Sequence, residues 1–194
     1  MVNHDYVSDE QIKDILACVT RYNRKQILRM MLFMSLNGLR CINFRSLVVS
    51  DVYNPDGSVK NIISLSGDKN KGKFAAQYYV NKQLKKELEA YYLYLKQKWG
   101  DKFSQETYLF TPNRVNKPYA RGSVCRIFHN LYKKFGIHGA SHMGRHIFIT
   151  KLINQSVNPL IVQRLVNHRN LQTTQNYYNE DPRRLLTAVE MAKF

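Results

Sequence analysis

The chain has 194 residues, and its 30 lysines and arginines against 14 acidic residues give a formal net charge of +16. So large an excess predicts a polyanionic partner, usually nucleic acid, although basic surfaces also serve membrane binding or solubility. Three distant cysteines (Cys18, Cys41 and Cys125) argue against a disulfide framework or a zinc ribbon, and the most apolar stretch, residues 27–36, is too short for a membrane span.

The N-terminal part of the sequence predicts three helices. Ser8 and Gln11 have the spacing of a capping box, and apolar residues recur at helical intervals behind them. Residues 25–37 are mostly apolar, which predicts a helix buried on several sides, with Gly38 as its C-terminal cap. A short helix is expected to follow over residues 43–47.

The middle of the chain changes character and predicts a small sheet. Residues 48–52 are rich in β-branched side chains, and residues 54–57 (Asn-Pro-Asp-Gly) form a turn signal. Residues 62–66 and 74–80 have the pattern of two further strands, joined by a cationic loop over residues 67–73. We therefore expect a three-stranded antiparallel sheet.

Helices dominate the rest of the sequence, so the predicted fold class is mainly α with one small three-stranded antiparallel sheet. No repeat or linker divides the chain, and we expect one domain over residues 1–179 followed by a helical tail over residues 180–194. The expected helices are one that ends near Gly100, one over 124–135 stopped by Gly136, one over 141–154, one that starts at Pro159 behind Asn158, a short one over 171–178 and a last one that opens at Pro182.

Four separated segments combine cationic and nucleophilic side chains. They are Asn37-Gly-Leu-Arg40, Asp68-Lys-Asn-Lys-Gly-Lys73, Ser141-His-Met-Gly-Arg-His146, and the stretch from Leu165-Val-Asn-His168 to Thr173-Thr-Gln-Asn-Tyr177-Tyr178. Metal-free cleavage of a phosphodiester needs fixed cations around the non-bridging oxygens, a covalent nucleophile and an acid for the leaving oxygen. The planar fork of arginine suits phosphate, a tyrosine hydroxyl can attack, and lysine or histidine can supply the proton.

The order arginine, lysine, His-x-x-Arg, histidine and tyrosine resembles the active-site order of the tyrosine recombinases. This family includes phage integrases, Xer-type resolvases and fimbrial inversion enzymes. Asn37-Gly-Leu-Arg40 is similar to its Gly-Leu-Arg box, His142-Met-Gly-Arg145 to its His-x-x-Arg box, and residues 165–177 to its Leu-Gly-His and Thr-Thr-x-x-Tyr segment. The likeness covers about residues 7–178, and the interval between the last histidine and the tyrosine is its most specific part.

The resemblance implies a role for each matching residue. Tyr177 would be the nucleophile that forms a 3′-phosphotyrosyl bond and releases a 5′ hydroxyl. Arg40 and Arg145 would clamp the scissile phosphate, and His168 would donate a hydrogen bond to one of its non-bridging oxygens. His142 would act as a base or as a further phosphate donor.

The resemblance also implies that a lysine of the hairpin loop protonates the leaving oxygen. Lys71 fits the family's distance to the following strand best, while Lys69 and Lys73 remain alternatives because hairpin registers can slip. Lys69, Lys73, Arg45 and Arg121 are the further cations that we expect to contact DNA.

The chain departs from the family pattern at two positions. The family usually has leucine where Gly144 stands, and glycine inside a helix costs about 1 kcal/mol relative to alanine. It usually has glycine where Asn167 stands. Neither change removes a reactive group, so both bear on packing. Tyr178 is a second candidate nucleophile, but the spacing from His168 favours Tyr177, and a neighbouring helical residue points about 100° away.

Each residue alone has an ordinary explanation, such as an ion pair, a helix cap or a packed aromatic ring, and their joint order favours the recombinase interpretation. We predict no metal, because no carboxylates or thiolates accompany His142 or His168. We predict no cofactor either, since a phosphotyrosyl bond would store the cleaved linkage. Two rival functions are a type IB topoisomerase-like nicking and closing enzyme and a DNA-binding regulator without catalysis.

The partner that the resemblance implies is double-stranded DNA, bound by four copies of the chain on two DNA sites. A monomer is possible without DNA, and the apolar stripe of the tail would dock on a neighbouring protomer or cover its own domain. No signal peptide is visible, so we expect a cytoplasmic protein without a membrane partner. Many members carry an N-terminal DNA-clamping domain, and this sequence is expected to be either a piece of such an enzyme or a small stand-alone enzyme.

Overall fold

The computed structural model describes residues 7–67, 75–113, 115–139, 141–175, 177 and 189–190. The chain forms two compact units, Met1–Phe148 (unit 1) and Ile149–Phe194 (unit 2). The boundary between them falls within helix α7 (Met143–Asn154). The three candidate lysines, Lys69, Lys71 and Lys73, lie outside the described residues.

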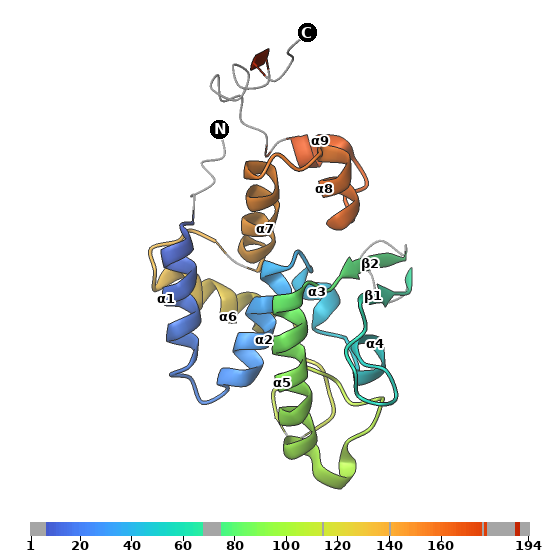
Figure 1. Ribbon diagram of the computed structural model, residues 1–194. Helices are drawn as coiled ribbons and strands as arrows, with labels where there is room; N and C mark the ends of the chain where they lie inside the picture. The colour runs from blue at the N-terminus through green and yellow to red at the C-terminus, as the bar shows by residue number, and fades with distance from the viewer. Residues whose placement is uncertain are drawn as a thin grey trace. The chain divides into compact units, whose positions relative to one another are not determined.

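Four long helices build unit 1. They are α1 (Asp9–Val19), α2 (Lys25–Leu36), α5 (Lys82–Trp99) and α6 (Arg121–Lys133). Helices α2 and α5 run side by side, with α1 and α6 to one side and the hairpin to the other (Figure 1). The predicted capping box is confirmed, because Ser8 and Gln11 exchange hydrogen bonds of 3.0 and 3.1 Å between side chain and backbone.

Helix α2 is the centre of the core, as its apolar sequence predicts. Its consecutive residues Met30 to Met34 are each at most 3% exposed, so this part of the helix is covered on every side. An ion pair also ties it to α5, where Arg29 donates to both carboxylate oxygens of Glu87, at 2.7 and 2.5 Å. Hydrophobic burial therefore holds α2 in place, and the ion pair fixes its rotation against α5.

The sheet has two antiparallel strands, β1 (Ile62–Leu65) and β2 (Ala76–Tyr79), where the sequence predicted three. The expected first strand is instead the short helix α4 (Val49–Val52). The carboxylate of Asp51 accepts a hydrogen bond from the Val48 amide at 2.9 Å, and Val49 and Val52 are both fully buried. This cap and the burial of Val49 and Val52, which lie three residues apart on one helix face, outweigh the preference of valine for strands.

The helix ends follow the predicted signals closely. Gly38 has φ 85° just after α2, and α5 ends at the expected glycine, Gly100. Helix α6 ends at Lys133, earlier than predicted, and Gly136 has φ 68° in the turn that follows it. The predicted short helix is α3 (Cys41–Phe44), two residues earlier than expected. The 3-10 turn η2 (Gly100–Lys102) extends α5.

Unit 2 contains the end of α7, then α8 (Pro159–Leu165) and α9 (Leu171–Gln175). The predicted cap of α8 is confirmed, because the Asn158 side chain accepts from the Leu160 amide at 2.8 Å. Four aliphatic side chains are at most 2% exposed: Ile149, Ile153, Val162 and Val166. The tail helix predicted behind Pro182 lies largely outside the described residues. In this tail the structure describes residues 189–190, and both are helical.

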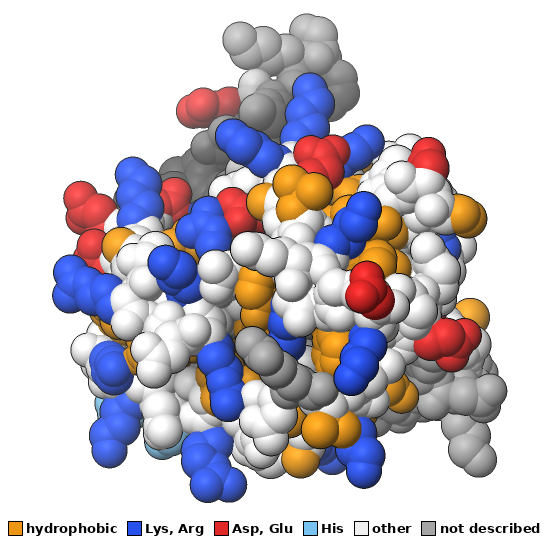
Figure 2. All heavy atoms as spheres, turned by 90° about the horizontal axis from the view of Figure 1, so that it is seen from below, with side chains coloured by type: hydrophobic (Ala, Val, Ile, Leu, Met, Phe, Trp, Pro, Cys, Tyr) orange, Lys and Arg blue, Asp and Glu red, His pale blue; other side chains and the backbone are white. Residues whose placement is uncertain are grey.

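The surface of the protein reflects its charge. Figure 2 shows Lys and Arg side chains spread over much of the face seen from below, with fewer acidic side chains among them. Among the described helices, none has the length and apolar content that a bilayer crossing demands.

Candidate active site

Within unit 1, the first candidate residue is Arg40, on the turn that follows α2. The Leu39 amide bonds to the Met34 carbonyl at 3.1 Å, which closes a Schellman-type cap around Gly38. The Asn37 side chain donates to the Phe33 carbonyl at 2.8 Å, and Leu39 is fully buried. Arg40 then caps the start of α3 in extended conformation and is half-buried. Its backbone is therefore fixed by two helix ends.

Arg145 joins this turn from a distant part of the sequence. It lies on α7, is 5% exposed, and its Nη1 donates to the Gly38 carbonyl at 2.6 Å. The bond connects positions that are 107 residues apart. The guanidinium has five donors in a fixed plane, so this bond sets the orientation of the fork.

Close packing of Gly144 brings Arg145 near this turn. A Cβ atom at position 144 would lie 2.8 Å from the Ser35 Cβ and 3.1 Å from its carbonyl carbon. Helix α7 thus touches α2 at a spot where a side chain has no room. The glycine that departs from the family's usual leucine is explained by this contact.

Ser141, just before α7, is buried against a cysteine of α6. Ser141 is 2% exposed, and its Oγ lies 3.3 Å from the Cys125 Sγ on α6. Burial raises the pKa of the neighbouring Cys41 thiol, which also interacts with Ser141 and Cys125. The next residue, His142, is exposed. The structure therefore anchors the His142 backbone while its imidazole lies at the surface.

A separate group of candidate residues lies in unit 2. The His168 Nδ1 is 2.9 Å from the Oγ1 of Thr174, which is fully buried on α9. The rings of His168 and Tyr177 stack with centroids 6.5 Å apart. Thr174 belongs to the matching Thr-Thr-x-x-Tyr segment, but the sequence alone predicted no role for it. A hydrogen bond between two side chains has no signature in the sequence.

Asn167 has a backbone conformation that explains the second departure from the family pattern. Its φ is 52°, in the left-handed region that glycine enters freely and asparagine enters more easily than most residues. The His168 amide bonds to the Gln163 carbonyl at 3.0 Å just after it. Asn167 therefore adopts the left-handed backbone conformation that the family's usual glycine would adopt, and the chain turns there just before His168.

Two expected DNA-contacting arginines differ in their surroundings. Arg45 is half-buried and donates to the Tyr119 carbonyl at 2.8 Å, which gives it a structural contact within unit 1. Arg121 is exposed at the first position of α6. Within the described part of the chain, no cluster of three or more metal-type ligands occurs.

The family pattern of the phage integrases matches residues 5–184. This chain belongs to the phage integrase family. The resemblance to tyrosine recombinases and the mainly helical fold with a small antiparallel sheet are thereby confirmed.

Relatives and solved structures agree with this membership. The integrase-family chain is 28% identical over 189 residues to the tyrosine recombinase XerA of Pyrococcus horikoshii. The matched region covers 96% of this chain and 61% of that protein. A crystal structure of XerA recombinase matches with TM-score 0.73 and 22% identity, over 97% of this chain and 66% of that one. XerH recombinase bound to difH matches with TM-score 0.72 and 16% identity, over 97% and 54%. The chain thus spans about three fifths of the XerA relative's length.

Replacing Gly144 of this integrase-family chain with alanine is expected to destabilise it. Alanine normally stabilises a helix by about 1 kcal/mol relative to glycine. Here its Cβ meets Ser35, and overpacking of this kind costs about 1–3 kcal/mol. Urea unfolding followed by circular dichroism should show a net loss of stability. The comparison variant is Gly122→Ala, where a Cβ has open space. A stabilised Gly144→Ala protein would contradict the tight contact.

If this integrase-family protein cleaves DNA, as the resemblance implies, removing the Thr174 hydroxyl should slow that cleavage while leaving the fold intact. Valine matches threonine in shape but cannot bond the His168 ring, so Thr174→Val should lower the cleavage rate about 10-fold. Thr174→Ser keeps a hydroxyl and should restore most of the rate. Single-turnover cleavage of a nicked duplex measures both. An unchanged rate in Thr174→Val would show that this bond does not orient the imidazole.

Proposed function

We propose that this chain is the catalytic domain of a site-specific DNA recombinase that cuts and rejoins double-stranded DNA through Tyr177. The observation that carries the proposal is the bond from Arg145 to the Gly38 carbonyl, which brings the two arginine motifs together across 107 residues. Two guanidinium groups near one turn are suited to a phosphate that gains negative charge during cleavage. Family membership and the DNA-bound XerH neighbour support the same reaction class.

The proposed reaction is a transesterification. The Tyr177 hydroxyl passes its proton to a base, for which His142 is the candidate, and attacks the phosphorus. The bond from phosphorus to the 5′ oxygen breaks, and that oxygen takes a proton from a hairpin lysine, Lys71 in first place. The product is a 3′-phosphotyrosyl bond, which a free 5′ hydroxyl later attacks to rejoin the strand. Because each step exchanges one phosphoester for another, the reaction uses no ATP.

Arg40 and Arg145 would stabilise the non-bridging oxygens in the transition state, and His168 would donate a further hydrogen bond. If the Thr174 hydroxyl donates to Nδ1 of the imidazole, the proton of the neutral ring resides on Nε2, which is the donor that a phosphate needs. His142, exposed at the start of α7, would serve as base or as another donor.

The wider assembly is part of the proposal. Four protomers would exchange strands in pairs on two DNA sites, with residues 1–179 as the catalytic domain and residues 180–194 docking on a neighbour. The net charge of +16 supports binding that weakens as salt rises. The three free cysteines suit a reducing cytoplasm.

Covalent capture on fragmented host DNA tests the proposal whatever the target sequence is. The protein is incubated with nicked fragments of that DNA, denatured, and the attached strands are sequenced, while mass spectrometry identifies the modified residue. A 3′ adduct on Tyr177 that yields recombinants supports the proposal. Relaxation of supercoils without recombinants would favour the topoisomerase, and site-specific binding without any adduct would favour the regulator.

A further inference from the structure

The turn that carries Arg40 is attached to the hairpin side of unit 1 at two places. The Asn81 Nδ2 donates to the Asn37 Oδ1 at 2.6 Å, three residues before Arg40. The Asn43 Nδ2 donates to the Tyr78 hydroxyl at 2.8 Å, three residues after Arg40. Both partners, Tyr78 and Asn81, follow the hairpin loop in sequence. The Arg40 turn is thus held on each side at an equal distance along the chain.

The position of Tyr78 is set by the register of the strands. Tyr78 pairs with Ile63 and Ala76 pairs with Leu65, and all four side chains are at most 2% exposed. A slip of one residue would turn every inward side chain of β2 to the opposite face. The Tyr78 hydroxyl would then leave Asn43, so the strand register and the α3 contact support each other.

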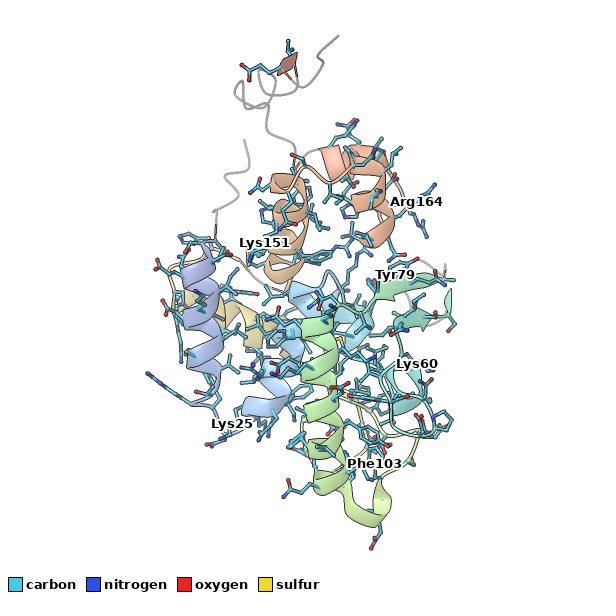
Figure 3. The ribbon with its side chains drawn as sticks, viewed as in Figure 1. Lys25, Lys60, Tyr79, Phe103, Lys151 and Arg164 are labelled. Carbon is cyan, nitrogen blue, oxygen red and sulfur yellow. The ribbon has the colours of Figure 1, made fainter. Side chains whose placement is uncertain are left out.

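Asn81 makes two bonds with different consequences. Its Oδ1 accepts from the Leu84 amide at 2.8 Å and caps α5, while its Nδ2 makes the bond to Asn37. Asn37 is 9% exposed and uses its own Nδ2 on the Phe33 carbonyl. One amide therefore joins the N-terminus of α5 to the C-terminus of α2. Figure 3 labels Lys25 at the lower end of α2, away from Tyr79 on β2, so the C-terminal end of α2 is the end on the Tyr79 side.

We propose that Tyr78 and Asn81 are positioning residues for Arg40 in phosphate binding; the inference rests on the proposed function. Arg40 stands between the end of α2 and the start of the four-residue helix α3, so contacts that hold these two helix ends also hold its backbone. A displacement of about 1 Å in a catalytic group can cost about 100-fold in rate. The bonds at Asn37 and Asn43 restrain this displacement from both sides.

The test compares variants that remove one bond each. Tyr78→Phe removes the hydroxyl, and Asn81→Ser removes the donor to Asn37 while keeping an oxygen that can cap α5. Tyr79→Phe is the matched control, because the Tyr79 side chain is 55% exposed and points away from the core. Thermal unfolding of each protein verifies the fold, and Asn81→Asp offers a second variant that keeps the cap.

Each protein is assayed on two nicked duplexes, one with a normal scissile phosphate and one with a methylphosphonate there. The methylphosphonate lacks the negative oxygen that Arg40 would neutralise, so a defect that acts through Arg40 should be smaller on it. We expect about a 10-fold loss on phosphate and about 2-fold or less on methylphosphonate for Tyr78→Phe and Asn81→Ser. Arg40→Ala should show the same pattern with a larger loss.

Equal losses on the two substrates, or no loss on phosphate, would overturn the inference. The inference would also be overturned if only a duplex with sulfur at the 5′ bridging position restored the rate of the variants. That result would mean that the two hydrogen bonds assist protonation of the leaving oxygen instead of phosphate binding by Arg40. The proposed function fails separately, if the unaltered protein forms no adduct. If that protein and Arg40→Ala behave as expected but the Tyr78 and Asn81 variants lack the larger loss on phosphate, only the positioning role is refuted.

Discussion

Replacement of Tyr177 by phenylalanine is expected to abolish the covalent adduct with DNA. The substitution removes the hydroxyl that would attack phosphorus and keeps the ring that stacks against His168. Loss of a nucleophile lowers the rate of covalent catalysis by about 10⁴-fold or more. Denaturing electrophoresis of a labelled nicked duplex should show no retarded protein–DNA band, while native electrophoresis should show DNA binding near that of the unaltered protein.

The neighbouring tyrosine provides the control for this result. Tyr178→Phe removes one hydroxyl from an adjacent position and should leave adduct formation intact. The opposite result, with the adduct lost in Tyr178→Phe and kept in Tyr177→Phe, would move the nucleophile by one residue. It would also separate the stacking against His168 from catalysis.

Arg145→Lys is expected to cause the second large loss, although it keeps the charge. The ammonium of lysine is a point donor and cannot hold the Gly38 carbonyl while presenting a planar fork to two phosphate oxygens. Removal of one preorganised donor from a site of this kind costs about 10²–10³-fold in rate. Loss of the buried bond to Gly38 should also lower the free energy of unfolding by about 2 kcal/mol.

The measurements for Arg145→Lys are single-turnover cleavage and urea unfolding of the same preparation. Arg126→Lys makes the same substitution at an exposed position of α6 and should change neither value appreciably. A cleavage rate within about 3-fold of the unaltered protein would mean that charge alone suffices at position 145, against the geometric argument for arginine.

Much of the fold could be predicted because its signals are local. The capping box at Ser8, the apolar run of α2 and the proline start of α8 each depend on residues a few positions apart. Residues 48–52 were wrongly predicted as a strand because β-branched content is a weak local preference. A single carboxylate cap and two buried valines decided that segment, and packing of this kind depends on the folded core.

The candidate site shows the same division between local and distant information. Residue types and their order indicated Arg40, Arg145, His168 and Tyr177, because the proposed chemistry demands those groups. Tyr78, Asn81 and Thr174 were not identified, since their proposed roles come from hydrogen bonds formed in the folded chain. Gly144 and Asn167 looked like unexplained departures until the Ser35 contact and the positive φ accounted for them.

The acceptor for Arg145 is a main-chain carbonyl, and this has a genetic consequence. A pair of side chains can be exchanged over evolutionary time by compensating substitutions, whereas every amino acid supplies the same carbonyl at position 38. A substitution at position 38 leaves this carbonyl in the main chain, and the φ of 85° disfavours any side chain there. Selection for revertants of an Arg145 lesion should therefore return arginine itself and not a suppressor at its partner.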